Sequence, residues 1–230
     1  MSPPQRDAAG AALKGQTRVV EPDRGERAIG RRSAETRATV PDLELSVDVD
    51  AGRLLQSVER DRVSTTAVLV AACAAALRAC PRANGAYRDG HFELYSRVNV
   101  AVTLPGPSSQ VAATVLDADA RSPAELEGEL TRLRGRARTG ELTPPEQAGA
   151  TFTLADLGEY GIHRAAALIT PPQAAALTAG AVRAVPVVRD GAVTAGRLLT
   201  LTLVSDHRIL FGAEAAGFLA AVAGHLERGA

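Results

Sequence analysis

Strict alternation of apolar and polar residues marks two parts of the chain as strands. Residues 43–51, LELSVDVDA, place aliphatic side chains on one face and polar side chains on the other. Residues 197–206, RLLTLTLVSD, alternate over a similar span. A period of two over such a length is typical of a half-buried antiparallel strand. Shorter apolar runs predict further strands at 91–96, 98–104, 110–118 and 151–158.

A run of small apolar residues predicts a helix that is buried on most sides. It covers residues 65–79, TTAVLVAACAAALRA. Ser64 suits the N-cap because its hydroxyl can accept a backbone N–H of the first turn, and Pro81 ends the helix. Cys73 and Cys80 lie two helical turns apart, ~10 Å, which is too far for a disulfide. We interpret both cysteines as buried small hydrophobic side chains.

Residues 122–146 carry the clearest helix signal. Ser122 and Glu125 form a capping box, and a proline occupies the first turn. Leucines spaced three and four residues apart then make one apolar stripe, and arginines follow near the C-terminal end of the helix dipole. Further helices are predicted at 25–40 (as a helix or an arm), at 52–60 and after Gly212.

Turn signals separate these elements and suggest the fold class. Residues 81–90, PRANGAYRDG, have turn composition, and the Asp190-Gly191 pair favours a hairpin. Strands outnumber helices and most look antiparallel, which predicts an α+β sandwich with helices packed on one side of the sheet. We expect residues 1–17 to form a disordered tail and residues 18–230 to form a single domain.

Charge and composition exclude several function classes. Lys+Arg and Asp+Glu both number 26, so the net charge is zero and nothing favours nucleic acid or an acidic membrane as a partner. Apolar runs are too short to span a bilayer, and the N-terminus has no apolar signal core, so we expect a cytoplasmic protein. The chain has no C-x-x-C or H-E-x-x-H spacing, so we expect no metal site.

One of the four histidines stands out by position. His91 lies in turn-rich sequence, His163 in a glycine-containing loop, and His225 near the end of the last predicted helix. His207 follows the long strand 197–206, where a turn leads into a helix. Such turns project side chains from a sheet edge, and an imidazole there can take a proton from a hydroxyl or thiol.

The last third of the chain closely resembles the catalytic domain of the dihydrolipoyl acyltransferases. The residues that carry the resemblance are TFTLADLG, GIHRAAALITPPQAAALTAGAVRAVPVVRDG and LLTLTLVSDHRILFGAEAAGFLAAV. A weaker likeness extends upstream, so the resemblance covers roughly residues 18–228. It implies the chloramphenicol acetyltransferase-like fold, usually trimeric, with active sites between subunits.

The resemblance also assigns roles to residues. In the D-H-R-x-x-D-G motif of the family the histidine is the general base, and this chain matches the motif at Asp206, His207, Arg208 and Gly212. The carboxylate of the motif, sometimes an amide, is replaced here by Phe211.

A second departure concerns the oxyanion. The serine whose hydroxyl stabilises the tetrahedral oxyanion in the family is replaced by Ala155. Thr153 is the candidate substitute donor because it shares the strand face of Ala155. Ala155 and Phe211 would then shape a more apolar substrate pocket than the family's own.

These observations favour an O-acyltransferase that moves an acyl group, most simply acetyl from acetyl-CoA, to a hydroxyl of a small apolar metabolite. A tetronate intermediate of polyketide natural-product biosynthesis is one such acceptor. No cofactor is expected beyond the acyl-CoA co-substrate. Because no lipoyl or subunit-binding segment is recognisable, we expect a free-standing homotrimer and not a large cage.

Two other interpretations remain open at this point. The loss of two polar site groups is compatible with a catalytically silent relative that acts as a binding or scaffold protein. A third possibility keeps His207 but uses it for cyclisation or elimination without an acyl donor.

Overall fold

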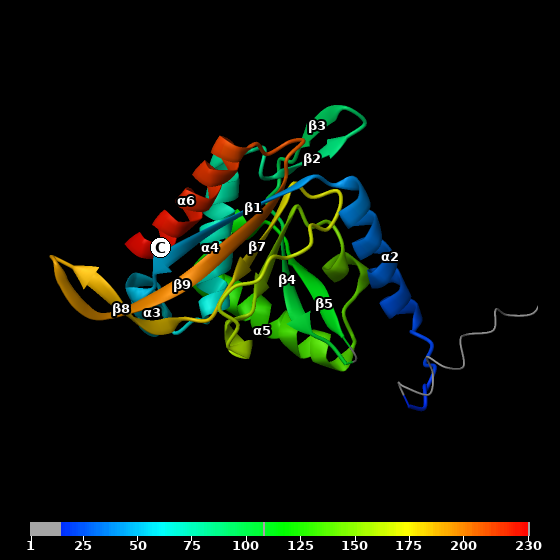
Figure 1. Ribbon diagram of the computed structural model, residues 1–230, viewed down its shortest axis with the longest axis horizontal. Coiled ribbons are helices and arrows are strands. Elements are labelled where there is room, and N and C mark those ends of the chain that lie inside the picture. Colours follow the sequence, from blue (N-terminus) through cyan, green and yellow to red (C-terminus); the bar gives the residue numbers. More distant parts are fainter. Residues whose placement is uncertain (1–14, 108, 230) are drawn as a thin grey trace, which may run out of the picture.

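A seven-stranded mixed sheet forms the centre of the computed structural model, which describes residues 15–107 and 109–229. The strand order is β1-β9-β7-β6-β4-β5, and β8 pairs with the first half of β9 (Figure 1). The strands are β1 (Asp42–Asp50), β4 (Val100–Pro105), β5 (Gln110–Val115), β6 (Phe152–Asp156), β7 (Ala175–Ala179), β8 (Arg183–Arg189) and β9 (Ala192–Asp206). Most of the predicted tail, residues 1–14, lies outside the described residues.

Helices cover one face of this sheet. They are α3 (Gly52–Asp61), α4 (Thr65–Ala79), α5 (Pro123–Thr139) and α6 (Gly212–Arg228). The buried leucines of α5 join apolar residues of α4, α6 and the inward faces of the strands in one continuous core. Burial of this apolar area is the main force that holds the helical layer on the sheet. The α+β class expected from the sequence is therefore the observed one.

The predicted helix caps are present. Ser64 accepts the backbone N–H of Ala67, and Ser122 and Glu125 form the reciprocal capping box. The helix expected at 25–40 is α2 (Arg24–Thr39), which extends away from the body of the molecule (Figure 1). Three short 3₁₀ turns complete the described elements: η1 (Ala118–Ala120), η2 (Pro144–Gln147) and η3 (Gly158–Tyr160).

The sheet is mostly antiparallel, as expected, and contains two parallel pairs, β4 with β6 and β6 with β7. Two sequence expectations need correction. Residues 81–90 were expected to be turn alone, but they contain β2 (Gly85–Arg88), which pairs with β3 (His91–Leu94) in a small hairpin. Cys73 is fully buried, as expected, but Cys80 is only half-buried because it follows the last turn of α4.

The other face of the sheet is partly covered by the segment between β6 and β7. The backbone at His163 passes close to Gly180. A Cβ atom added to Gly180 would lie 2.0 Å from the His163 carbonyl oxygen. Ala181 N–H donates to the Ile162 carbonyl at 2.7 Å in the same crossing. We call this second surface the outer face, to distinguish it from the face that carries the helices.

No single helix among the described residues is both long and apolar enough to cross a membrane. The pair α3 and α4 would meet that criterion together, but the two helices are bent by 113° at the break between them.

Candidate active site

His207 lies where the sequence placed it, in the turn between β9 and α6. Its side chain is exposed, and its backbone N–H donates to the Pro41 carbonyl at 2.9 Å. Ile209 and Leu210, which follow in the same turn, are completely buried. Their N–H groups both donate to the Asp206 carbonyl. The turn is therefore held by burial and hydrogen bonding on both sides of an exposed imidazole.

Asp206 and Arg208 form a tight pair beside the histidine. The carboxylate of Asp206 accepts the backbone N–H of Arg208 at 3.0 Å and its Nη2 at 2.7 Å. Asp206 is buried, and these hydrogen bonds raise the pKa of the Arg208 guanidinium above its ordinary value. The pair therefore holds the turn beside the exposed imidazole of His207.

Phe211 contacts His207 and belongs to a group of aromatic and arginine side chains. The Phe211 ring packs edge-on against the imidazole, with 5.8 Å between the ring centroids. The guanidinium carbon of Arg82 lies 5.5 Å from the Phe211 ring centroid and 5.0 Å from that of Phe92. Arg82 also pairs with Glu214 at 3.0 Å. We call Phe92, Arg82 and Phe211 the aromatic stripe.

The β2–β3 hairpin, which contains Phe92, also contacts the Asp206–Arg208 pair through Tyr87. The Arg208 guanidinium carbon lies 4.8 Å from the ring centroid of Tyr87, which is 6.3 Å from that of Phe92. Sequence reasoning missed Arg82, Tyr87 and Phe92 because they lie in or beside the segment interpreted as a turn. The alternation of GAYR and HFEL around Asp89-Gly90 was the available signal for a hairpin.

Two of the predicted site residues, Thr153 and Ala155, lie on the outer face and away from His207. Thr153 and Ala155 are in β6, which is separated from β9 by β7. Across the three strands Thr153 is in register with Val204, and Ala155 is in register with Thr202. Two strand spacings and the residues from Thr202 to Asp206 separate Ala155 from the histidine turn by about 16 Å. By the same estimate Thr153 lies about 12 Å from the turn. One chain therefore does not bring these residues together with its own His207.

The hydroxyl of Thr153 is already committed. It donates to the side-chain carbonyl oxygen of Gln173 at 2.7 Å, and both residues are buried. Ala155 is 9% exposed and presents only its methyl group. Gly212 begins α6, and Phe211 occupies the N-cap position without a side-chain cap. The geometry gives Thr153 less freedom to serve as an oxyanion donor than the sequence suggested.

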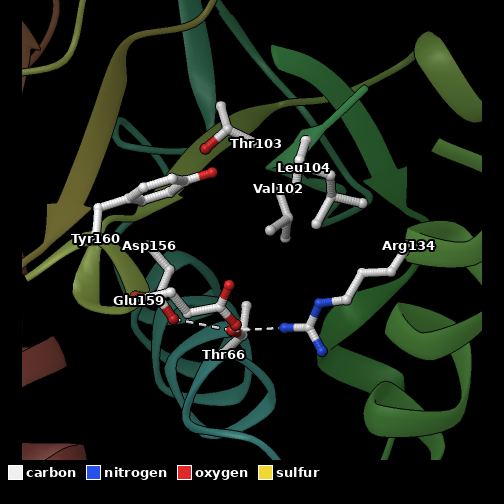
Figure 2. A pocket seen from close by; sticks show the side chains of 9 residues that line it. Thr66, Val102, Thr103, Leu104, Arg134, Asp156, Glu159 and Tyr160 are labelled. Carbon is white, nitrogen blue, oxygen red and sulfur yellow. Dashed lines mark hydrogen bonds between the residues drawn. The ribbon is translucent and has the colours of Figure 1, made fainter. Parts of the chain in front are cut away.

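A small pocket lies at the carboxyl end of β4 and β6 (Figure 2). Thr66 stands between Asp156 and Arg134 there: its hydroxyl donates to Asp156 at 2.8 Å and accepts from Arg134 at 2.8 Å. The second carboxylate oxygen of Asp156 accepts the Gly158 N–H at 3.0 Å. This network joins α4, α5 and β6, and Glu159 and Tyr160 complete the polar lining of the pocket.

The remaining histidines occupy ordinary positions. His163 lines an open pocket on the outer face together with Asp48, Arg183 and Thr200. His91 is in the β2–β3 hairpin and His225 in the last turns of α6. Within the described residues no group of three or more His, Cys, Asp or Glu side chains is arranged to hold a metal ion.

Comparison with protein families identifies one match over nearly the whole chain. The model of the catalytic domain of the 2-oxoacid dehydrogenase acyltransferases matches residues 14–230. The acetyltransferase component of the Zymomonas mobilis pyruvate dehydrogenase complex is 33% identical over 204 residues, 85% of this chain and 46% of that protein. The chain thus spans about half the length of the curated relatives it matches.

Solved structures share the fold. The Azotobacter vinelandii dihydrolipoamide acetyltransferase, studied for the roles of a serine, a histidine and an asparagine in catalysis, superposes with a TM-score of 0.89 at 22% identity. The alignment covers 98% of this chain and 97% of that one. Chloramphenicol acetyltransferase superposes with a TM-score of 0.55 at 13% identity, covering 85% of this chain and 94% of that one.

One of these matches corrects an expectation about assembly. The cubic core of the pyruvate dehydrogenase multienzyme complex superposes with a TM-score of 0.89 at 23% identity, over 98% of this chain and 97% of that one. The expectation of a homotrimer that is not part of a large cage is therefore wrong. It rested on segments that flank the catalytic fold, whereas the fold itself is one from which large cores are built.

Proposed function

Because the chain belongs to the family of 2-oxoacid dehydrogenase acyltransferases by its catalytic domain, we propose that it transfers an acyl group from acyl-CoA to a hydroxyl. Residues 18–230 form the catalytic domain in this proposal, and acetyl-CoA is the donor. The observation that carries the proposal is the exposed His207, held in a rigid turn by the buried Asp206–Arg208 pair.

The spacing of three residues supports this assignment. In the Azotobacter enzyme the serine precedes the histidine by 52 residues and the asparagine follows it by four. Counted from His207, the same spacings fall on Ala155 and Phe211. The base is therefore retained, whereas a methyl group and a phenyl ring replace the two other polar side chains.

The reaction is an acyl transfer through a tetrahedral intermediate. The imidazole of His207 takes the proton of the acceptor hydroxyl as its oxygen attacks the thioester carbonyl carbon. The C–S bond breaks when the intermediate collapses, and the CoA sulfur leaves with the proton returned by the imidazolium. The products are an ester and free CoA, and the enzyme regains its starting state.

The surroundings of His207 favour an apolar acceptor. Phe92 and Phe211 are 42% and 41% exposed, and Leu94 beside them is 54% exposed. Arg82, which lies on both rings, is paired with Glu214, and Arg208, which lies on the Tyr87 ring, is paired with Asp206. A largely apolar surface without net charge next to the base suits an acceptor with a hydrocarbon part, such as a tetronate intermediate of polyketide origin.

The separation of the site residues points to a site shared between copies. The turn that carries His207 begins about 16 Å from Ala155 within one chain, too far for both residues to act on one thioester carbonyl. A second copy whose outer face meets the His207 turn would complete the site.

The deciding experiment measures CoA release from acetyl-CoA with a panel of acceptors. The panel contains primary alcohols with alkyl tails of increasing length. Each methylene buried on the aromatic stripe should raise kcat/KM by about two- to fourfold. His207→Ala should lower the rate by about 10²–10⁴-fold with the fold intact by circular dichroism. A fully active His207→Ala variant would contradict the role of the base.

A second candidate acceptor is a dihydrolipoyl thiol. It is favoured by the relatives, which are acetyltransferase components that act on dihydrolipoyllysine residues. Adding dihydrolipoamide to the same panel separates the two: a higher kcat/KM for the thiol than for any alcohol would select it. An absence of CoA release with every acceptor would favour a catalytically silent binding protein instead.

A further inference from the structure

Thr178, in β7, has a buried hydroxyl without a partner among the described residues. Its side chain is 1% exposed, and Oγ1 makes no hydrogen bond to any of the described residues. A buried hydroxyl that is left unpaired is unfavourable, and a native protein rarely keeps one without a reason.

The hydroxyls around Thr178 on the outer face are all engaged. Thr202, its register neighbour in β9, shares a hydrogen bond of 3.0 Å with Ser46. Thr200 donates to Asp48 at 2.6 Å, and Thr153 donates to Gln173 at 2.7 Å. Thr178 differs from these neighbours because its O–H proton is uncommitted.

The other register neighbour of Thr178 is Ala155. Side chains of paired residues on adjacent strands project from the same face of the sheet, about 5 Å apart. Ala155 has a methyl group at the position that the spacing from His207 assigns to a serine in the Azotobacter enzyme. The unpaired hydroxyl is therefore one strand away from the place where a hydroxyl is missing.

We propose that Thr178 donates the hydrogen bond that stabilises the oxyanion of the tetrahedral intermediate, in place of the hydroxyl that Ala155 lacks. This inference rests on the proposed acyl transfer. A thioester carbonyl oxygen lying over the Ala155 methyl would come within reach of Thr178 Oγ1. The threonine donates throughout and transfers no proton, so the proton balance of the reaction remains with His207.

The geometry requires the histidine of a second copy. Thr178 is one strand and about four residues from Asp206 in its own chain, a separation of about 14 Å. Ala155 is 9% exposed and Thr178 is 1% exposed, so the substrate would approach over Ala155 and meet Thr178 from the side. Thr178 is thus a catalytic residue that touches the reacting carbonyl oxygen in the proposed complex.

The test removes the hydroxyl while keeping the shape of the side chain. In Thr178→Val, kcat should fall by about 10²-fold, since one oxyanion donor contributes about 10²–10³-fold. KM should change little, because the donor acts on charge that develops in the transition state. Tm should stay the same or rise, because the substitution removes an unpaired buried polar group.

Matched variants separate this role from a structural one. Thr200→Val, on the same face, loses a real hydrogen bond, so its Tm should fall while transfer continues. Thr178→Ser should keep transfer, because it keeps the hydroxyl. The double variant Ala155→Ser/Thr178→Val should have a kcat at least tenfold higher than that of Thr178→Val alone. If Thr178→Val fails to fold, the kcat ratio of Thr178→Ser to Thr178→Ala replaces it, with about 10² expected.

The outcomes distinguish the two proposals. An active unaltered chain together with a fully active Thr178→Val variant overturns the role of Thr178 and leaves the acyl transfer standing. A loss of kcat in Thr178→Val that is accompanied by a fall in Tm also overturns it, because a residue with a purely structural role would produce both effects. The absence of transfer by the unaltered chain overturns both.

Discussion

Phe211 is the residue that most distinguishes the surroundings of the base. It packs against His207 on one side and against Arg82 on the other, so its ring is held in place by two partners. A phenyl ring at this position offers no hydrogen bond to a polar acceptor. Selectivity at the site is therefore expected to depend on the apolar area that an acceptor buries and not on the geometry of hydrogen bonding.

Phe211→Asn should shift acceptor preference toward polar molecules. The asparagine restores a donor and acceptor beside His207 and removes apolar surface. The ratio of kcat/KM for dihydrolipoamide to that for a long-chain alcohol should rise by about tenfold, because the thiol substrate gains a hydrogen bond and the alcohol buries less apolar area. Steady-state kinetics with both acceptors measure this ratio. Phe92→Leu, which keeps an apolar side chain, is the control, and an unchanged ratio in Phe211→Asn would contradict a role in selectivity.

Among the elements, α5 and η2 are joined by a charged network that depends on pH. Glu146 accepts hydrogen bonds from the backbone N–H and the hydroxyl of Thr143, and it pairs with Arg132 and Arg136. The Thr143 backbone hydrogen bond, with Arg132 next, lowers the pKa of Glu146 to about 2. The network fixes the end of the helix that covers β4 and β5.

Glu146→Gln should lower the free energy of unfolding near neutral pH and have little effect in strong acid. A carboxylate with a lowered pKa stabilises the fold above its unfolded-state pKa of about 4.3. That contribution is lost as pH falls from there through about 2. Urea titrations of both proteins at several pH values measure the difference. A gap that stays constant between pH 7 and pH 2.5 would contradict the role of the ionised carboxylate.

At the scale of the whole molecule, the sheet keeps the base and the proposed oxyanion donor on different parts of one chain. The end of β9, after which His207 follows, lies beside the β2–β3 hairpin (Figure 1). Ala155 and Thr178 are register neighbours within the outer face. The helical layer packs against the opposite face and cannot bring the base and the donor closer. The proposed catalysis therefore requires association between chains.

Specific activity should therefore fall when the protein is diluted below the concentration at which copies dissociate. The fall should be greater than about tenfold and should follow the sedimentation coefficient, because each site needs residues from two chains. Activity and sedimentation velocity measured over the same dilution series test this. Full activity in a fraction that sediments as a single chain would show that one copy is sufficient.

Much of the fold could be predicted from local patterns. The alternation in β1 and β9, the caps at Ser64 and Ser122 and the Asp190-Gly191 turn all act over a few residues, so their physics is visible in the sequence. The parallel pairing of β6 with β4 and β7 was not predicted, because it joins segments far apart in the chain. The β2–β3 hairpin was missed because its strands are only four residues long and lie among turn residues.

The candidate site divides along the same line. The sequence by itself determined that His207 follows a strand within an Asp-His-Arg motif, and that Ala155 and Phe211 are not polar. Only the tertiary structure showed that Arg82 contacts Phe92 and the Phe211 ring that packs against His207. It also showed that Thr153 is bound to Gln173 and that Thr178 has an unpaired hydroxyl beside Ala155. The sequence determines which residues are present, but the register between distant strands decides which side chains meet. A register shift of one residue would move every side chain of a strand to the opposite face of the sheet.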